Sequence, residues 1–389
     1  MNWTFWQIIA SPHVSELVRA LASMPDQTVT MVGEYELSER RKTLGWNTPD
    51  CSPARLLIRP KEDEIQQLIR RNDGHESVHL VGGLQRGTLN RRVLPHLAKT
   101  GAMVGLMTET GDSRGFLGLP RRAKFLLDRY LVEDYLDFIV AMGQVGVQWY
   151  GSVGYHPARI FPFMYVTERR LPAPESSDKS NATGKFRILY LGHFIRRKDG
   201  VTAIRALNRL SHCDWQFDLV GNGPELERWK KVASEGGFAD RIRFLPPVNN
   251  RMIGHMLEGA DLLLLPSRFD GWGAVVNEAL MCGVPVVCSD NCGAADLLRE
   301  PWRGSTFKMG SVDDLEIVLR GWITRGKRNE ESSARIRKWS SALEGPSLAS
   351  YLVQIVRYLK EGGQRPSPPW RQFCGDEEDN PFPRFARSG

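Results

Sequence analysis

The chain alternates between short apolar runs and amphipathic stretches, and this alternation occurs in two successive series. In the first series, seven apolar runs are suited to strands, at residues 3–10, 28–33, 54–58, 78–83, 102–107, 137–142 and 159–162. Helical patterns lie between several of these runs, at 15–23, 62–70 and 123–135. Strands separated by helices favour βαβ units, in which helices cover both faces of a parallel sheet.

A second series begins after a segment at 167–185 that is rich in Pro, Ser and charge and is typical of an exposed linker. Its expected strands are 186–192, 215–220, 242–245, 261–265 and 284–288. Its expected helices are 201–210, 225–236, 250–258, 272–281 and 312–325. Two Rossmann-like sheets joined by a linker would face each other across a cleft, where ligands bind outside the carboxyl ends of the strands.

The two series divide the chain into domains. We expect a first Rossmann-like domain at 1–166, a linker at 167–185 and a second Rossmann-like domain at 186–345. An amphipathic helix at 348–360 follows, within the segment 346–362. Residues 363–389 combine Pro, Gly and charge, a composition typical of a disordered tail.

The charge balance limits the partners of the chain without choosing among them. The 389 residues carry a formal net charge of +7, which favours an anionic partner such as a nucleotide, a phospholipid surface or a nucleic acid. No nucleic-acid-binding motif accompanies this charge. The amino-terminal residues are typical of a strand and not of a signal peptide, and no apolar run reaches about 18 residues. We therefore expect a cytoplasmic protein.

Three of the six cysteines, Cys282, Cys288 and Cys292, fall in the run CGVPVVCSDNCG. Such a cluster could suggest a metal site, but no CxxC pair or second cluster completes a tetrahedral set of ligands. We interpret these cysteines as small buried residues in a reducing compartment, and we expect no metal.

Three turns that follow expected strands in the second series are candidate ligand contacts. Gly192 ends the first strand and precedes Arg197 and Lys198, a pair of cations suited to a diphosphate. Asn222 lies between two glycines in the next strand–helix turn. Val248 follows the third strand, where backbone contacts to a base could be made. Each signal is weak by itself, because basic or Gly-rich turns are common.

The segment DLLLLPSRFDGWGAVVNEALMCGVPVV carries a stronger signal. A buried strand is followed by Asp270, by the turn residues Gly271, Trp272, Gly273 and Ala274, and by a helix that carries Glu278. The two carboxylates can accept hydrogen bonds from hydroxyls at two ends of one bound molecule, while amides at the helix N-terminus face its phosphates. Because an apolar run follows Glu278, we expect this acid to be buried.

Residues 186–298 resemble the retaining glycosyltransferases of family 4, which have a GT-B fold and a Glu-x7-Glu pair before an EAL-x-x-G-x-P-V-V segment. The resemblance implies that Gly192, Arg197 and Lys198 hold the diphosphate of a nucleotide-sugar donor. It also implies that Glu278 holds the ribose hydroxyls and that Asp270 holds hydroxyls of the transferred sugar. The amides of 271–274 would lie along the phosphate and sugar. The resemblance further implies that the first domain, 1–166, lies on the acceptor side and that the second domain, 186–345, binds the nucleotide-sugar donor. It also implies that a C-terminal helix crosses back to the first domain and that no cofactor is needed.

The sequence departs from the family pattern at several positions. Asp270 replaces the commoner Glu, and His193 follows Gly192 where many members have Arg. In the first domain, Thr108 and Glu109 stand where members often carry a histidine. His13 follows the first strand and could reach the cleft, although an isolated histidine is more often structural. The candidate catalytic residues are thus Asp270, Glu278, Lys198 and His13.

A basic and apolar stretch at 114–129 is a candidate membrane contact. It combines cations with apolar side chains, namely Arg114, Arg121, Arg122, Lys124 and Arg129 with Phe116, Leu117, Phe125 and Leu126. A helix of this composition could lie on an anionic membrane surface, as in family members that act on lipid-linked acceptors. A surface helix with one buried stripe explains the pattern equally well.

The sequence and the resemblance together predict a metal-independent hexosyltransferase that moves a sugar from a nucleoside-diphosphate sugar to a saccharide or lipid-linked acceptor. The resemblance implies that the configuration of the sugar is retained. Surface polysaccharide or glycolipid assembly is the expected setting. Two alternatives remain open: a GT-B nucleotide-sugar epimerase or phosphorylase, and a catalytically inactive sugar- or nucleotide-binding partner. Neither the base, the sugar nor the acceptor follows from the sequence.

Overall fold

The computed structural model describes residues 1–39, 41, 47–112, 118–169 and 184–372. The chain forms two compact units. Unit 1 comprises Met1–Glu168 and Ala342–Pro369, and unit 2 comprises Arg169–Ser341 and the chain from Trp370 onward. Most of the expected linker lies outside the described residues. Three residues of the basic and apolar stretch also lie outside them, namely Arg114, Phe116 and Leu117.

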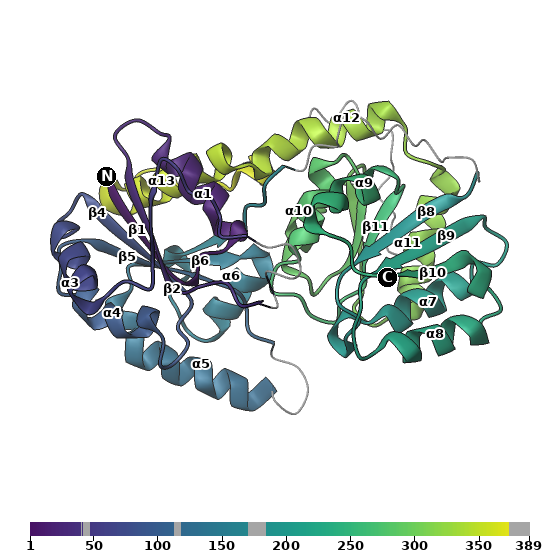
Figure 1. Ribbon diagram of the computed structural model, residues 1–389, viewed down its shortest axis with the longest axis horizontal. Helices are drawn as coiled ribbons and strands as arrows, with labels where there is room; N and C mark the ends of the chain where they lie inside the picture. Colours follow the sequence, from purple (N-terminus) through teal and green to yellow (C-terminus); the bar gives the residue numbers. More distant parts are fainter. Residues whose placement is uncertain (40, 42–46, 113–117, 170–183, 373–389) are drawn as a thin grey trace. The chain divides into compact units, whose positions relative to one another are not determined.

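Unit 1 is built on a seven-stranded sheet whose neighbouring strands all pair in parallel, in the order β3-β2-β1-β4-β5-β6-β7 (Figure 1). The strands are β1 Asn2–Ile9, β2 Thr28–Tyr35, β3 Arg55–Ile58, β4 Ser77–Gly82, β5 Met103–Thr108, β6 Phe138–Met142 and β7 Ile160–Phe163. The strand order reverses between β1 and β4, so a topological switch point lies at their carboxyl ends.

Helices that lie between the strands in sequence complete unit 1. They are α1 Pro12–Ala22, α3 Glu62–Arg71, α4 Leu89–Leu97, α5 Gly118–Val132 and α6 Gly143–Ser152. The helix α13 Gly345–Glu361 comes from the far end of the chain and packs against α1. At their contact, a Cβ on Gly345 would lie 2.8 Å from the carbonyl oxygen of Glu16, so glycine permits this close approach. The C-terminal helix therefore returns to unit 1, as predicted.

Unit 2 contains a six-stranded parallel sheet in the order β10-β9-β8-β11-β12-β13. The strands are β8 Phe186–Leu191, β9 Trp215–Val220, β10 Ile242–Leu245, β11 Leu262–Leu265, β12 Val286–Ser289 and β13 Gly304–Phe307. The helices are α7 Gly200–Asn208, α8 Leu226–Glu235, α9 Ile253–Glu258, α10 Ala274–Met281, α11 Val312–Arg325, α12 Glu330–Trp339 and α14 Pro369–Gln372. The order reverses between β8 and β11, which places a second switch point at their carboxyl ends (Figure 1).

The start of the expected tail is ordered, contrary to the prediction from composition. Residues 369–372 form α14, and Trp370 is 1% exposed. The Trp370 indole nitrogen donates a hydrogen bond to Asp296 Oδ2 at 3.0 Å, and Arg371 Nη2 lies 2.7 Å from the same oxygen. The contacts of Trp370 and Arg371 with the buried Asp296 carboxylate order these residues, although the composition of the segment favours disorder. Residues 373–389 lie outside the described part of the chain.

Several further elements were not predicted. The strand β13 is only four residues long, and the helix α12 has a largely polar sequence with Ile336 and Trp339 buried. The helix α4 contains Pro95, a residue that is uncommon inside helices. Among the described residues, no helix is both long and apolar enough to span a membrane.

Candidate functional site at the switch point of unit 2

The turns after β8 and β9 pack backbone against backbone. Gly192 donates its amide hydrogen to the carbonyl of Val220 at 3.1 Å. A Cβ on Gly221, whose φ is +151°, would lie 1.9 Å from the carbonyl oxygen of Gly192. A Cβ on Gly223 would likewise lie 2.3 Å from the carbonyl oxygen of Phe194. The glycines on both sides of Asn222 are therefore required by this interlocked geometry.

Two cations after β8 meet an acid after β11. Lys198, at the end of a 3₁₀ turn (Arg196–Lys198), forms an ion pair with the Asp270 carboxylate. Arg197 Nη1 donates a hydrogen bond to the carbonyl of Phe269 at 2.9 Å and lies 3.6 Å from Asp270 Oδ1. The structure thus brings Asp270 together with two adjacent cations, of which Lys198 is 72 positions away in the sequence. They lie at the switch point because β8 and β11 are neighbours in the sheet.

Asp199 holds the basic turn in place, and sequence reasoning did not single it out. Its backbone is left-handed, with φ +47°, an uncommon conformation for a residue other than glycine. Its carboxylate accepts hydrogen bonds from Thr202 Oγ1 at 2.8 Å and from Arg268 Nε at 2.9 Å. Arg268 also donates its backbone amide hydrogen to the carbonyl of Arg197 at 2.8 Å. These contacts fix the cations against the turn that follows β11.

The turn after β11 is tied to the turn after β12. Asp270 donates its amide hydrogen to the carbonyl of Asn291 at 3.3 Å, and Gly293 donates to the carbonyl of Asp270 at 3.0 Å. A Cβ on Gly293 would lie 2.3 Å from the carbonyl oxygen of Gly271, so the two turns touch through their backbones. The sequence did not predict a role for Asn291 and Gly293, because their role depends on the packing of the turn after β12 against the turn after β11.

The Gly-rich turn delivers the N-terminus of α10 to the same place. Gly273 caps the helix with φ +95°, and a Cβ there would lie 2.8 Å from Cys292 Sγ. Trp272 is buried and donates its indole N–H to Asn277 Oδ1 at 2.8 Å, which fixes the turn onto the helix. The first amides of a helix have no partner within it, so they form a natural site for an anion.

Both acids of the predicted pair are largely buried. Asp270 is 8% exposed and Glu278, in the second turn of α10, is 7% exposed. The expectation that Glu278 is buried is therefore confirmed. Buried carboxylates are rare unless they are paired, and Asp270 is paired with Lys198.

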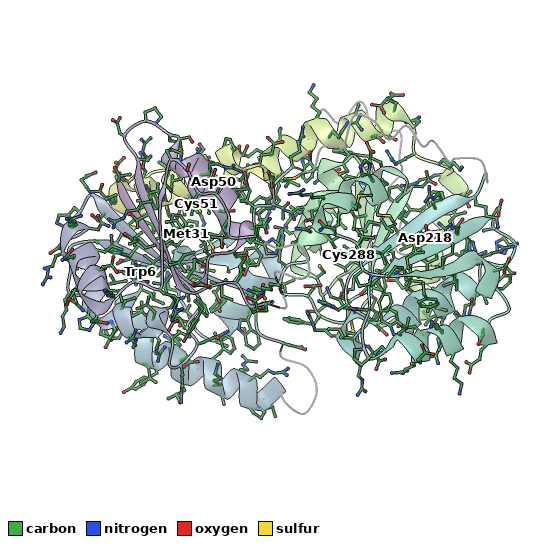
Figure 2. The ribbon with its side chains drawn as sticks, in the orientation of Figure 1. Trp6, Met31, Asp50, Cys51, Asp218 and Cys288 are labelled. Carbon is green, nitrogen blue, oxygen red and sulfur yellow. The ribbon has the colours of Figure 1, made fainter. Side chains whose placement is uncertain are left out.

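Two buried groups near Asp270 keep their protons, namely the Tyr190 hydroxyl and the Cys288 thiol. Tyr190 is fully buried and donates its hydroxyl to the carbonyl of His193 at 2.9 Å. Burial raises the pKa of Tyr190 well above its usual range, and the Asp270 carboxylate raises it further. A hydrogen bond with Cys292 and burial raise the pKa of the Cys288 thiol, which is labelled in Figure 2. These groups stay neutral, so the local charge comes from the cations and carboxylates.

The three cysteines of the run CGVPVVCSDNCG are buried, as expected. The five described cysteines are all free, and four of them are buried, namely Cys51, Cys282, Cys288 and Cys292. Within the described ranges, no group of three His, Cys, Asp or Glu side chains is placed as metal ligands are.

The remaining predicted residues are His13, Val248 and Asn222. His13 belongs to unit 1, where its carbonyl accepts a hydrogen bond from the Val166 amide at 3.0 Å and its ring lies 5.8 Å from that of Tyr165. Val248 lies in the turn after β10 and is half-buried. Asn222 is exposed, and its carbonyl accepts a hydrogen bond from the Phe194 amide at 2.7 Å.

Comparison with known families identifies the part of the chain around this site. Residues 173–339 match the family model described as Glycosyl transferases group 1. The chain is 28% identical over 121 residues to a 2-deoxystreptamine N-acetyl-D-glucosaminyltransferase of Niallia circulans, a match that covers 31% of each chain. It is 30% identical over 134 residues to a D-inositol 3-phosphate glycosyltransferase of Geodermatophilus obscurus, covering 34% of this chain and 29% of the relative. These matches span about a third of the relatives' length.

Solved structures resemble nearly the whole chain. The lipopolysaccharide outer core galactosyltransferase WaaB aligns with a TM-score of 0.65 at 14% identity, covering 92% of this chain and all of that one. Anabaena Alr3699/HepE, solved in complex with UDP, aligns with a TM-score of 0.66 at 15% identity, covering 92% of this chain and 99% of that one. This likeness shows the fold: the chain has the GT-B fold, with one Rossmann-like sheet in each unit.

Proposed function

We propose that this chain, whose residues 173–339 match the glycosyl transferases group 1 model, is a glycosyltransferase. It moves a hexosyl-type sugar from a nucleoside-diphosphate sugar to a saccharide or lipid-linked acceptor, in surface polysaccharide or glycolipid assembly. Retention of configuration, as in family 4, belongs to the same proposal. The names of the relatives and structures described above are those of glycosyltransferases, or of a protein solved with UDP, and none is that of an epimerase.

One observation carries the proposal. Arg197 and Lys198 after β8, Asp270 after β11 and the N-terminus of α10 converge at the switch point of unit 2. A diphosphate needs cations and free amides, and a sugar needs carboxylates that accept hydrogen bonds from its hydroxyls. This cluster supplies both kinds of group within a single unit.

The proposed chemistry relies on stabilising the leaving group. When the bond between the sugar C1 and the diphosphate oxygen breaks, negative charge develops on the nucleoside diphosphate. Arg197, Lys198 and the amides of 271–274 would stabilise that charge without a metal, and fixed charges of this kind provide much of an enzyme's rate. Glu278 would hold the ribose hydroxyls, and Asp270 would hold hydroxyls of the sugar. Lys198 would exchange its Asp270 partner, in whole or in part, for the phosphate.

A thermal-shift panel tests the donor. UDP, GDP and ADP, with and without their sugars, are added to the purified chain, because a ligand that binds the folded state raises Tm by mass action. One nucleotide series should raise Tm in the wild type and fail to do so in Glu278→Ala. If all of these nucleotides leave Tm unchanged at millimolar concentration, the proposal is wrong.

Product analysis separates the proposed function from its alternatives. The nucleotide-sugar is incubated with the chain alone and then with saccharide acceptors, and products are identified by NMR. Transfer that gives the same anomeric configuration as in the donor is the expected outcome. A new free nucleotide-sugar isomer without acceptor would indicate an epimerase. Donor binding without transfer to a broad acceptor panel would indicate an inactive partner. Loss of transfer with intact donor binding in His13→Ala would support a role for His13.

We also propose that α5 contacts an anionic membrane surface. Five large apolar side chains of this helix are exposed: Leu119, Leu126, Leu127, Tyr130 and Leu131. Arg122 and Lys124 are exposed on the same helix, so apolar and basic groups are available together. An interfacial helix combines these features, and the charge is complementary to anionic lipid headgroups.

Liposome co-sedimentation tests this contact. Vesicles that contain about a third anionic phospholipid should bind the wild type at low salt, and binding should fall with salt as the Debye length shortens. Leu127→Asp should weaken binding, because it puts a charge on the apolar face. Ile317→Asp is the matched control, since Ile317 is also an exposed apolar residue, on α11 of unit 2. Equal sedimentation of both variants, or no binding of the wild type, would contradict the contact.

A further inference from the structure

Two residues of the short C-terminal helix α14 bind a buried carboxylate of unit 2. Trp370 donates its indole N–H to Asp296 Oδ2 at 3.0 Å. Arg371 Nη2 lies 2.9 Å from Oδ1 and 2.7 Å from Oδ2 of the same carboxylate. Both residues follow the region 173–339 that matches the family model, so these contacts are additional to the part of the chain that the model describes.

The Asp296 carboxylate obtains much of its hydrogen bonding from α14. Its side chain is 1% exposed, so water does not easily replace a lost partner. Arg299 Nη2 lies 2.7 Å from Oδ1, whereas Oδ2 accepts hydrogen bonds from Trp370 and Arg371. Burying a carboxylate is costly unless it is paired and hydrogen-bonded. Release of α14 would therefore favour movement of Asp296 toward water.

Asp296 lies in a 3₁₀ turn that continues directly from the turn after β12. This 3₁₀ turn, Gly293–Leu297, begins at the residue whose amide donates to the Asp270 carbonyl at 3.0 Å. The next amide, that of Ala294, donates to the carbonyl of Trp272 at 2.8 Å. The 3₁₀ turn is therefore joined to the Gly-rich turn by its first residues and to α14 by Asp296.

The packing between these two turns leaves little room for adjustment. A Cβ on Gly293 would lie 2.3 Å from the carbonyl oxygen of Gly271, and a Cβ on Gly273 would lie 2.8 Å from Cys292 Sγ. Closely packed interiors transmit strain, so a displacement of the 3₁₀ turn has to displace the Gly-rich turn as well. The Gly-rich turn carries the amides of 271–274, which face the donor diphosphate in the proposed function.

We propose that Trp370 and Arg371 are positioning residues for the donor diphosphate, and that they act through Asp296 on the Gly-rich turn before α10. This inference rests on the proposed function, because it concerns the site assigned there to the nucleotide-sugar donor. Neither residue contacts the donor. Both hold the 3₁₀ turn in the position that aligns the amides of 271–274, and amides that are already aligned bind an anion without a cost of reorganisation.

Nucleotide titrations on the full chain test this role. The probe is whichever of UDP, GDP and ADP raises the Tm of the wild type, and its affinity is measured by calorimetry. Trp370→Phe keeps an aromatic ring but removes the indole N–H. The variant should bind the nucleotide about threefold to tenfold more weakly, the usual effect of losing one hydrogen bond.

Trp215→Phe is the matched control. Trp215 is also fully buried in unit 2, and it donates its indole N–H to the carbonyl of Leu210 at 2.9 Å. It lies at the amino end of β9, whereas the site lies at the carboxyl ends of the strands. Trp215→Phe should therefore lower Tm without changing the affinity for the nucleotide. If Trp370→Phe binds the nucleotide as the wild type does, the inference is overturned.

A double-mutant cycle tests whether Trp370 acts through Asp296. Asp296→Asn keeps the size of the side chain but removes its charge, so it should also weaken nucleotide binding. Because the two residues are in direct contact, Trp370→Phe should have little further effect on affinity in the Asp296→Asn background. Additive effects of the two substitutions would contradict action through Asp296.

Hydrogen exchange without ligand measures the coupling between the turns themselves. In Trp370→Phe the amides of 293–297 and 271–274 should exchange faster than in the wild type, while those of 192–199 should not change. Unchanged exchange at 271–274 would overturn the inference. If the wild type binds none of the nucleotides, the proposed function fails and this inference fails with it. Equal nucleotide binding by the wild type and Trp370→Phe would defeat only this inference.

Discussion

The two units share one sheet topology, but the side chains at their switch points differ in chemistry. In each sheet the first four strands are arranged in the order third, second, first, fourth, so each has a switch point beside its first strand. In unit 2 that point carries Arg197, Lys198 and a Gly-rich turn before α10. In unit 1 a cavity of about 450 Å³ lies there, lined by the amide of Gln7, the carboxylates of Glu109 and Asp128 and aromatic rings. Topology therefore fixes where a ligand binds, and the local side chains decide which ligand it is.

Lys198→Ala gives the largest effect expected from this comparison. Lys198 is the cation paired with Asp270, and its loss removes charge that would stabilise the departing diphosphate. The value of kcat for sugar transfer should fall about a hundredfold to a thousandfold, as for the loss of one preorganised donor. Lys231→Ala, at an exposed lysine of α8, is the control. A fall of less than threefold in a folded Lys198→Ala would show that unit 2 does not stabilise the leaving group in this way.

Lowering the pH should reduce the stability of unit 1, because His79 is buried in its neutral form. This histidine of β4 is fully buried beside Trp6, which donates its indole N–H to His79 Nδ1 at 3.2 Å (Figure 2 labels Trp6). Burial lowers the pKa of His79 to about 4 from 6.5. Below pH 6.5 the unfolded chain binds a proton that the folded chain does not, so the free energy of unfolding falls until the pH reaches about 4. The total loss is roughly 3 kcal/mol.

Hydrogen exchange of the β4 amides at pH 7, 6 and 5 measures this effect within unit 1. Opening free energies derived from the exchange should fall with pH after correction for the intrinsic rates. His212→Gln, at an exposed histidine of unit 2, should leave that trend unchanged. Opening free energies of β4 that stay constant from pH 7 to pH 5 would contradict the assignment of His79 as a buried neutral group.

Glu278→Gln tests whether Glu278 contributes to nucleotide binding in unit 2. The substitution keeps the size of the side chain but replaces a charged acceptor, and hydrogen bonds to charged groups contribute about 1.5–3 kcal/mol. Affinity for the nucleotide should therefore fall about tenfold to a hundredfold in calorimetric titrations. Glu235→Gln, at an exposed acid of α8, serves as the control. Unchanged affinity in Glu278→Gln would remove this residue from the donor site.

Gly293→Ala tests whether the paired turns of unit 2 form one structure. The added Cβ would lie 2.3 Å from the Gly271 carbonyl oxygen, so the turn after β11 has to shift. We expect a loss of about 1–3 kcal/mol in the free energy of unfolding, as for other overpacked sites. Gly151→Ala has open space and lies in α6, so it should stabilise the chain by about 0.5–1 kcal/mol. A Tm for Gly293→Ala equal to that of the wild type would contradict the close packing.

The sequence allowed much of the fold to be predicted because the strands are short, apolar and bounded by turns. The expected ranges of β9, β10 and α11 agree with the structure at both ends. By contrast, α12 has few apolar residues, and the order at Trp370 depends on Asp296, a residue 74 positions away. Hydrophobic periodicity is a local property of the sequence, so it does not reveal contacts between residues that are far apart in the chain.

The candidate sites show the same division. Arg197, Lys198 and Asp270 were predictable because each follows an apolar strand, and parallel strands end at one edge of the sheet. Their roles toward a ligand stay predictions. Gln7 and Asp128 were not predictable, since one is an amide at a strand end and the other is an acid within a charged helix. Only the folded chain shows that both lose water and face the same cavity.

Hydrogen–deuterium exchange with and without ligand tests the central claim most directly. With the nucleotide that raises Tm, amides of 192–199 and 271–278 should become protected, while those of 82–85 and 106–109 should not change. Protection by the nucleotide at 82–85 and 106–109, with none at 271–278, would show that the donor does not bind at the switch point of unit 2.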